Sequence, residues 1–170
     1  MTKYIAIDGK GGSGKTYMSE LLASRLQARL FHLDDYGDDY KPFIGIPTLR
    51  KLVAKATDDI VIYEGVGVFD DQFDDLRPFR IFVQVPEEIR KQRAEGRDVP
   101  RDDRTAEDWK EIWEIWDEAE PACFTESIIQ KADMIVGTKD GNFDVDAIVT
   151  QFASGQQAKQ DHSTYEREGV

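Results

Sequence analysis

Apolar residues along the chain follow two alternating patterns. Short runs of consecutive apolar residues, typical of strands buried on both faces, alternate with longer segments whose apolar residues recur at helical spacing. The short runs predict strands at residues 3–8, 29–33, 59–65, 79–85 and 132–138. The periodic segments predict helices at residues 15–26, 46–56, 86–96, 105–120 and 143–153. This alternation indicates an α/β fold with a parallel sheet covered on both faces.

Residues with known boundary preferences support the predicted helices. Pro86 precedes two acids, and Gly96 ends the pattern, so these residues bracket one helix. Thr105 and Asp108 have the spacing of a capping box at the start of the next helix. That helix carries an apolar stripe at positions i, i+3, i+4 and i+7, which we interpret as core packing rather than as a platform for a nucleobase. The stripe consists of Trp109, Ile112, Trp113 and Trp116.

The length of 170 residues fits a single domain with a substantial core. We expect residues 1–153 to form this domain. Residues 154–170 are polar and aperiodic, which predicts a frayed tail. The oligomeric state stays open at this level.

The charge balance excludes some classes of partner. A net charge of −12 argues against nonspecific binding to nucleic acid or anionic membranes, because that binding needs basic patches. A small anionic ligand is still permitted, since a local site can oppose the overall sign. The single cysteine, Cys123, excludes a disulfide framework and suggests a structural thiol in a reducing compartment. No apolar run approaches the roughly 18 residues of a membrane-spanning helix, and no signal-peptide pattern opens the chain, so we expect a cytoplasmic protein.

Residues 9–16, GKGGSGKT, match the phosphate-loop pattern G-x-x-x-x-G-K-[ST] in full. The pattern follows a predicted strand and opens a predicted helix, as it must. Its backbone amides and the helix N-terminus form an anion site, while Lys15 can reach the β- and γ-phosphates and Thr16 can ligate Mg²⁺. We therefore predict a site for ATP and Mg²⁺. It comprises Gly9, Gly11, Gly12, Ser13, Gly14, Lys15, Thr16 and Tyr17.

Acidic residues follow two other predicted strands. Glu64 closes the apolar run IVIYE, as the acid of a Walker B element does, and Asp34 and Asp35 follow the strand at residues 29–33. In a parallel sheet these strand ends should lie at the edge that holds the phosphate loop. The acids of residues 31–40, FHLDDYGDDY, form either a solvated turn or a group that holds Mg²⁺ and accepts a proton.

The combination of GKGGSGKT, LDDY after the second strand and VIYEG on the third resembles the uridine kinase-like branch of the P-loop kinases. That branch also includes phosphoribulokinase and pantothenate kinase relatives. The resemblance implies a three-layer P-loop NTPase fold with a five-stranded parallel sheet and a small arginine-bearing helical lid. It further implies that Asp34 is the base and a metal contact, and that Glu64 supports Mg²⁺. Asp35 stands beside the family's aspartate position, so it is a second candidate for the base and for the metal.

Residues 90–104 resemble the lid that this family closes over the phosphates. Arginine suits that task because its planar guanidinium grips phosphate oxygens in a bidentate manner. The resemblance assigns catalytic roles to Arg93 and Arg97, and Arg90, Arg101 and Arg104 continue the series. Interleaved acids allow the alternative of a salt-bridged surface helix.

The acceptor side is less defined by the sequence. Tyr36, Tyr40 and Phe43 could face an aromatic acceptor or pack a loop, and the pattern does not favour either. His32 lies within the second predicted strand, where we expect a structural role rather than a catalytic one.

These observations predict an ATP- and Mg²⁺-dependent kinase that acts on a small molecule, with a nucleoside or related alcohol as acceptor. A GTPase-type switch is disfavoured, because Asp34-x-x-Gly37 comes after the second strand and the guanine-reading motif Asn-Lys-x-Asp is missing. A nucleotide-binding regulatory module without transferase activity remains open, because an intact phosphate loop serves binding as well as catalysis.

Overall fold

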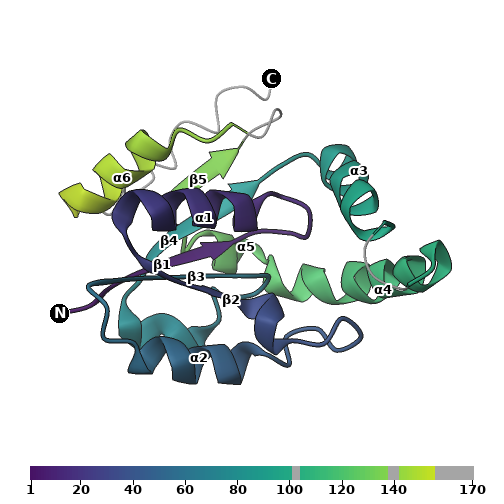
Figure 1. Ribbon diagram of the computed structural model, residues 1–170, viewed down its shortest axis with the longest axis horizontal. Helices are drawn as coiled ribbons and strands as arrows, with labels where there is room; N and C mark the ends of the chain where they lie inside the picture. Colours follow the sequence, from purple (N-terminus) through teal and green to yellow (C-terminus); the bar gives the residue numbers. More distant parts are fainter. Residues whose placement is uncertain (101–103, 138–141, 156–170) are drawn as a thin grey trace.

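The computed structural model describes residues 1–100, 104–137 and 142–155, which form a three-layer α/β fold (Figure 1). The strands are β1 (Lys3–Asp8), β2 (Arg29–His32), β3 (Ile60–Glu64), β4 (Phe79–Gln84) and β5 (Met134–Gly137). The α-helices are α1 (Lys15–Leu26), α2 (Ile46–Lys55), α3 (Glu87–Asp98), α4 (Ala106–Ala119), α5 (Glu126–Ile129) and α6 (Val145–Ser154). Three 3-10 helices are η1 (Leu33–Tyr36), η2 (Asp71–Leu76) and η3 (Glu120–Cys123). The predicted fold class is confirmed, and the predicted tail lies outside the described residues from position 156 onward.

All strand pairs of the sheet are parallel, in the order β2-β3-β1-β4-β5. The register places Ile7 of β1 opposite Glu64 of β3, and Glu64 opposite His32 of β2. Because parallel strands end at the same edge, the loop after β1 lies beside the ends of β3 and β2. The sheet topology therefore brings the phosphate loop and the strand-end carboxylates together.

Alternate side chains of the strands enter two separate hydrophobic cores. Ile5 and Ile7 of β1, with Ile62 of β3, face the side covered by α1 and α6. Ala6 of β1 and Tyr63 of β3 face the side covered by α2 and η2. All five residues are fully buried, and burial on both faces explains why the strands read as continuous apolar runs. In the described part of the chain, we find no helix that is long and apolar enough to cross a membrane.

Helices α3 and α4 lie beyond the sheet edge that carries the phosphate loop, and we call this pair the lid (Figure 1). Helix α3 continues to Asp98, so the predicted end at Gly96 is wrong. Apart from the backbone of α3 itself, no atom of the described residues lies within 4 Å of a Cβ added at Gly96, so no close packing requires glycine there. Asp98 is buried and accepts a hydrogen bond from Trp113 Nε1 at 3.1 Å, which holds the last turn of α3 against α4. Arg97 is therefore helical, while Arg101 lies outside the described residues.

Candidate active site

The phosphate loop connects β1 to α1 and depends on glycines at two close approaches. Gly9 and Gly12 have φ angles of 150° and 74°, a region that favours glycine. A Cβ at Gly9 would lie 2.5 Å from Val83 O, and one at Gly12 would lie 2.4 Å from Arg90 O. The loop is thus packed tightly between β4 and α3, and only glycine fits at these positions.

Lys15 and Thr16 begin α1 and point two different polar groups into the site. Lys15 is 7% exposed and its Nζ donates a hydrogen bond to Lys10 O at 3.1 Å. Thr16 Oγ1 donates to Glu64 Oε1 at 3.2 Å. The structure thus brings three predicted residues together: Lys15, the predicted phosphate ligand, and Thr16 and Glu64, two of the predicted metal ligands.

Other predicted residues of the loop differ in their surroundings. Ser13 is fully buried, and its hydroxyl has no hydrogen-bond partner among the described residues. Tyr17 is 54% exposed, with its ring centroid 6.4 Å from that of Phe143. Gly14 also faces Phe143, since a Cβ there would lie 3.5 Å from the Phe143 ring. The sequence analysis missed Phe143, whose proximity to the loop depends on the return of the chain after β5.

Glu64 is 2% exposed and accepts a second hydrogen bond from His32 Nδ1 at 2.7 Å. This hydrogen bond raises the pKa of His32, partly offset by burial of the ring. His32 thus contacts a predicted metal ligand, a role that the sequence analysis missed. The signal was available in principle, because neighbouring parallel strands that end in His32 and Glu64 place these residues side by side.

The two adjacent aspartates of η1 have different positions. Asp34 lines the same cavity as Lys15 and Glu64. Desolvation raises the pKa of Asp34, and the negative charge of Glu64 raises it further. Both aspartates are solvent-exposed, but Asp35 lies outside the set of described residues that line this cavity. Of the two predicted candidates, Asp34 therefore has the geometry of a group that can meet an acceptor.

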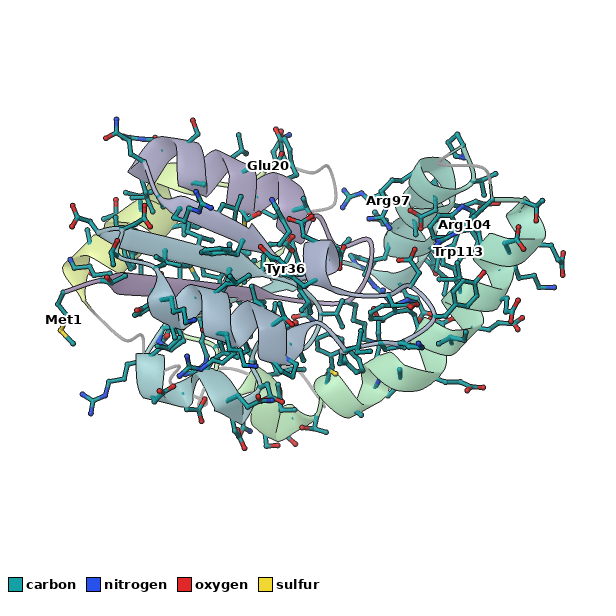
Figure 2. The ribbon with its side chains drawn as sticks, turned by 60° about the horizontal axis from the view of Figure 1, so that its bottom comes forward. Met1, Glu20, Tyr36, Arg97, Arg104 and Trp113 are labelled. Carbon is teal, nitrogen blue, oxygen red and sulfur yellow. The ribbon has the colours of Figure 1, made fainter. Side chains whose placement is uncertain are left out.

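The phosphate loop, the strand-end carboxylates and the lid enclose a cavity of about 750 Å³. Its far wall is formed by α3 and α4, which contribute Arg97 and Trp113. Figure 2 shows Arg104, from the segment between the two helices, close to both side chains. Asp39, from the loop after η1, also lines the cavity and forms an ion pair with Arg104. The cavity is large enough for a nucleotide or a comparable pair of small ligands, in the range usual for ligand sites of roughly 300–1,000 Å³.

The predicted lid arginines separate into different roles. Arg93 lines the cavity, and its Nη1 lies 4.0 Å from the position of a Cβ added at Gly14, beside the phosphate loop. Arg97 also lines the cavity and is held by Asp98, with 2.5 Å between Nε and Oδ1. Arg90 also lines the cavity, but it is buried and its guanidinium donates to the backbone of the loop.

The tryptophan stripe of α4 packs in the core only in part, because Trp109 and Ile112 are buried whereas Trp113 and Trp116 are half-buried. Trp109, Trp113 and Trp116 all line the cavity. Trp116 Nε1 donates to Asp39 O at 3.0 Å, and its ring meets Phe43 edge to face at 5.6 Å. The pattern of α4 was amphipathic as expected, but the surface that it covers is a ligand-sized cavity beside the sheet.

The aromatic residues at the end of η1 and in the loop that follows it lie outside the cavity lining. Tyr36 and Phe43 lie against the hydrophobic core on the α2 side of the sheet. Tyr40 is 43% exposed, with the guanidinium of Arg104 5.7 Å from its ring centroid. Of the two interpretations left open by the sequence, the structure favours loop packing for these side chains.

Asp8, at the end of β1, is a site residue that the sequence analysis missed. Its fully buried carboxylate accepts backbone hydrogen bonds from Gly9 at 2.7 Å, Gly67 at 3.0 Å and Phe69 at 2.9 Å. It therefore ties the start of the phosphate loop to the loop after β3. Desolvation raises the pKa of Asp8 to about 6, against the three N–H donors and Lys15. An acid at the end of an apolar run was the available signal, the same one that identified Glu64.

The oxygen ligands of the site fit Mg²⁺. Thr16 Oγ1 and Glu64 Oε1 lie 3.2 Å apart, and Asp34 lines the same cavity. Hydroxyl and carboxylate oxygens are the ligands that Mg²⁺ takes, and it usually completes its shell with water and substrate phosphates. Within the described part of the chain, no group of three or more His, Cys, Asp or Glu side chains is placed so that these residues alone could hold a metal ion.

The strand order and the loop after β1 give the chain a fold that is also found in solved structures of a shikimate kinase and a gluconokinase. No protein-family model matches the sequence, and no curated protein is significantly similar to it. Solved structures with this fold include shikimate kinase from Acinetobacter baumannii in complex with shikimate (TM-score 0.59, 16% identity, covering 92% of this chain and 96% of that one). A gluconokinase from Sinorhizobium meliloti 1021 gives a TM-score of 0.57 at 13% identity, covering 98% of both chains. An uncharacterized protein from Eubacterium ventriosum ATCC 27560 gives 0.61 at 16%, covering 90% and 99%.

Proposed function

We propose that the protein is an ATP- and Mg²⁺-dependent phosphotransferase that moves the γ-phosphoryl group of ATP to a hydroxyl of a small molecule. The observation that carries this proposal is the convergence of three parts on one cavity: the phosphate loop with Lys15, the carboxylate of Asp34, and the arginines of the lid. Phosphoryl transfer depends mainly on positioning and charge stabilisation, and these parts supply both.

The residues of the site have separable roles in this reaction. The loop amides and Lys15 bind the phosphates, and Arg93 and Arg97 stabilise the charge that develops on the transferring group. Asp34 accepts the proton of the acceptor hydroxyl as the new oxygen–phosphorus bond forms, while the bond between the β,γ-bridging oxygen and the γ-phosphorus breaks and ADP leaves. Thr16, Asp34 and Glu64 would hold Mg²⁺, which offsets negative charge on the phosphates when bound.

We propose a nucleoside or a related alcohol as the acceptor. The sequence motifs that resemble the uridine kinase-like branch support a nucleoside. The structural neighbours support a wider range, since two of them are a shikimate kinase and a gluconokinase. Trp109, Trp113 and Trp116 line one side of the cavity, here called the tryptophan wall. This wall offers flat apolar surface on which a ring-shaped acceptor can pack.

The alternative is a regulatory module that binds a nucleotide without transferring its phosphoryl group. The phosphate loop, the metal ligands and the cavity-facing arginines are compatible with this role. A base for an acceptor hydroxyl, the role that we propose for Asp34, is needed only for transfer. ADP release that depends on an added alcohol would distinguish a kinase from such a module. A GTPase-type switch would hydrolyse GTP without an acceptor.

The proposal is tested by measuring ADP release with ATP and Mg²⁺ over nucleosides, nucleotides, pantothenate, shikimate and sugars. We expect acceptor-dependent release that Lys15→Ala abolishes and that Asp34→Asn lowers by roughly 100-fold or more, the usual contribution of a general base. Asp35→Asn is the matched comparison, because it removes a neighbouring carboxylate outside the cavity lining, and it should retain most of the activity. Full activity of Asp34→Asn on a confirmed acceptor would refute the assigned base, and no stimulation by any alcohol would favour the regulatory module.

A further inference from the structure

Two buried charged residues at the base of the lid grip one residue of the phosphate loop. Arg90 of α3 is 8% exposed, and its Nη1 donates to Gly11 O at 2.8 Å. Glu120, at the end of α4, is 6% exposed, and its Oε1 accepts from Gly11 N at 2.7 Å. The second carboxylate oxygen lies 3.9 Å from the Arg90 guanidinium. Both backbone polar groups of Gly11 are thus bonded to an ion pair that spans the two lid helices.

The packing around this pair leaves little freedom for the loop. A Cβ at Gly11 would lie 3.0 Å from Glu120 Oε1, and one at Gly12 would lie 2.4 Å from Arg90 O. The main chain of α3 therefore lies close to Gly12, and the Glu120 side chain lies close to Gly11. A larger residue at Gly12 would displace the main chain of α3, whereas one at Gly11 would require the Glu120 side chain to shift.

The ion pair is costly to bury, so a purely stabilising role is a weak explanation for it. Desolvating two charges offsets much of their attraction, and an apolar pair of similar size is often as stable. The Gly11 amide is also already bonded to a carboxylate, although the sequence analysis assigned Gly11 to the nucleotide. The amides at the N-terminus of α1 remain as the natural phosphate ligands.

We infer that Arg90 and Glu120, here called the Gly11 clamp, are positioning residues that fix the phosphate loop relative to both lid helices. The inference rests on the proposed function, in which the loop binds the phosphates of ATP. The clamp sets the position of Arg93, which follows Arg90 by three residues on the same helix and reaches the loop beside Gly14. Through α4 it also sets the tryptophan wall of the cavity.

The first test needs no nucleotide. Amide exchange of Gly11, measured by NMR, should be slow in the wild type and at least about tenfold faster in Glu120→Ala, because a hydrogen bond to a charged group is worth about 1.4 kcal/mol or more. Glu120→Gln should keep slow exchange, since its amide oxygen can still accept from Gly11 N. Glu118→Gln is the matched control, because it changes an exposed acid two residues earlier on α4. Unchanged Gly11 exchange in a folded Glu120→Ala protein would overturn the clamp.

The second test measures nucleotide affinity with a fluorescent ADP analogue in the presence of Mg²⁺. Glu120→Ala and Arg90→Met should each weaken binding at least about tenfold, and the double variant should lose no more than the worse single variant, because both residues act through Gly11. Glu120→Gln and Arg90→Lys should recover most of the affinity, and melting curves check that each variant is folded. Additive losses, or affinities that stay at the wild-type value, would show that the pair does not position the loop.

The two tests separate the clamp from the kinase proposal. Analogue binding requires no acceptor, so a protein that binds nucleotide but phosphorylates no alcohol would refute the proposed function and leave the clamp measurable. A wild type that binds no nucleotide would refute the clamp's role together with the proposed function. Exchange at Gly11 would then show only whether the contacts exist.

Discussion

At the scale of single residues, Asp8 places a fully buried carboxylate at the start of the phosphate loop. A fully buried carboxylate loses its hydration, and the three backbone N–H groups that it accepts from recover only part of that loss. The result is a pKa raised from its usual 3.8 to about 6. Protonation of Asp8, which holds the start of the phosphate loop, should therefore change the free energy of unfolding of the protein.

The stability of the protein should therefore depend on Asp8 in a defined range of pH. Because the folded-state pKa is above the unfolded-state value, protonation favours the folded state. The contribution is full below pH 3.8 and is lost as the pH rises to about 6; a shift of this size corresponds to on the order of 3 kcal/mol. Urea unfolding of the wild type and Asp8→Asn should show a wild-type advantage that is greater at pH 4 than at pH 7.

Asp58→Asn is a suitable control for this measurement, because it makes the same chemical change at an exposed position before β3. Its free energy of unfolding should follow that of the wild type at both pH values. A wild-type advantage over Asp8→Asn that instead grows with pH would mean that the three N–H donors outweigh burial and that the pKa lies below its usual value.

The residues of the site differ in how far the sequence could predict them. Lys15, Thr16 and Glu64 were predictable, because a local motif and a strand end define them. Asp8 also ends a predicted strand and His32 lies near the end of another, but their hydrogen-bond partners depend on which strands are neighbours. The clamp depends on the return of the chain at residue 120. A single sequence does not contain that information in any local pattern.

At the scale of elements, α4 begins with the capping box that the sequence predicted. Thr105 Oγ1 accepts from Asp108 N at 3.2 Å, and Asp108 Oδ2 accepts from Thr105 N at 2.7 Å. Thr105→Ala should lower the free energy of unfolding by about 1 kcal/mol, because one N-terminal donor of the helix loses its partner. The measurement is urea unfolding followed by circular dichroism.

Thr125→Ala is the matched control for the cap of α4. Thr125 is the N-cap residue of α5, but its side chain makes no capping hydrogen bond. We expect it to cost clearly less than Thr105→Ala. Equal losses at the two positions would mean that the change of side chain, rather than the cap, determines the effect.

The lid shows where element prediction fails. Glycine is common at helix ends, which is why the sequence predicts an end at Gly96. Asp98 lies beyond it, however, and is buried with a hydrogen bond from Trp113 of α4. The contact between two helices outweighs the local preference of glycine, which costs only about 1 kcal/mol in a helix. The strands were predicted better, because a strand that is buried on both faces consists of consecutive apolar residues, which can be recognised in the sequence.

At the scale of the whole molecule, the site joins segments from the first strand to residue 120, so ligand binding should stabilise the entire fold. A nucleotide at 100 times its dissociation constant adds about 2.7 kcal/mol, which corresponds to roughly 5–10 °C in melting temperature for a domain of this size. We expect Mg²⁺ with ATP or ADP to produce such a shift in differential scanning fluorimetry, and Lys15→Ala to remove most of it.

GTP provides the comparison for this experiment. A shift with GTP and none with ATP would contradict the proposed kinase and would favour a GTPase-type switch. Lys15→Ala that shifts as much as the wild type would show that the nucleotide binds elsewhere on the molecule.

The tryptophan wall has a practical consequence. All three tryptophans of the chain lie on α4 and line the cavity. Their intrinsic fluorescence therefore originates from one wall of the candidate site, with no contribution from tryptophans elsewhere in the sequence. The protein carries its own optical reporter, so ligands can be followed at this wall without a label.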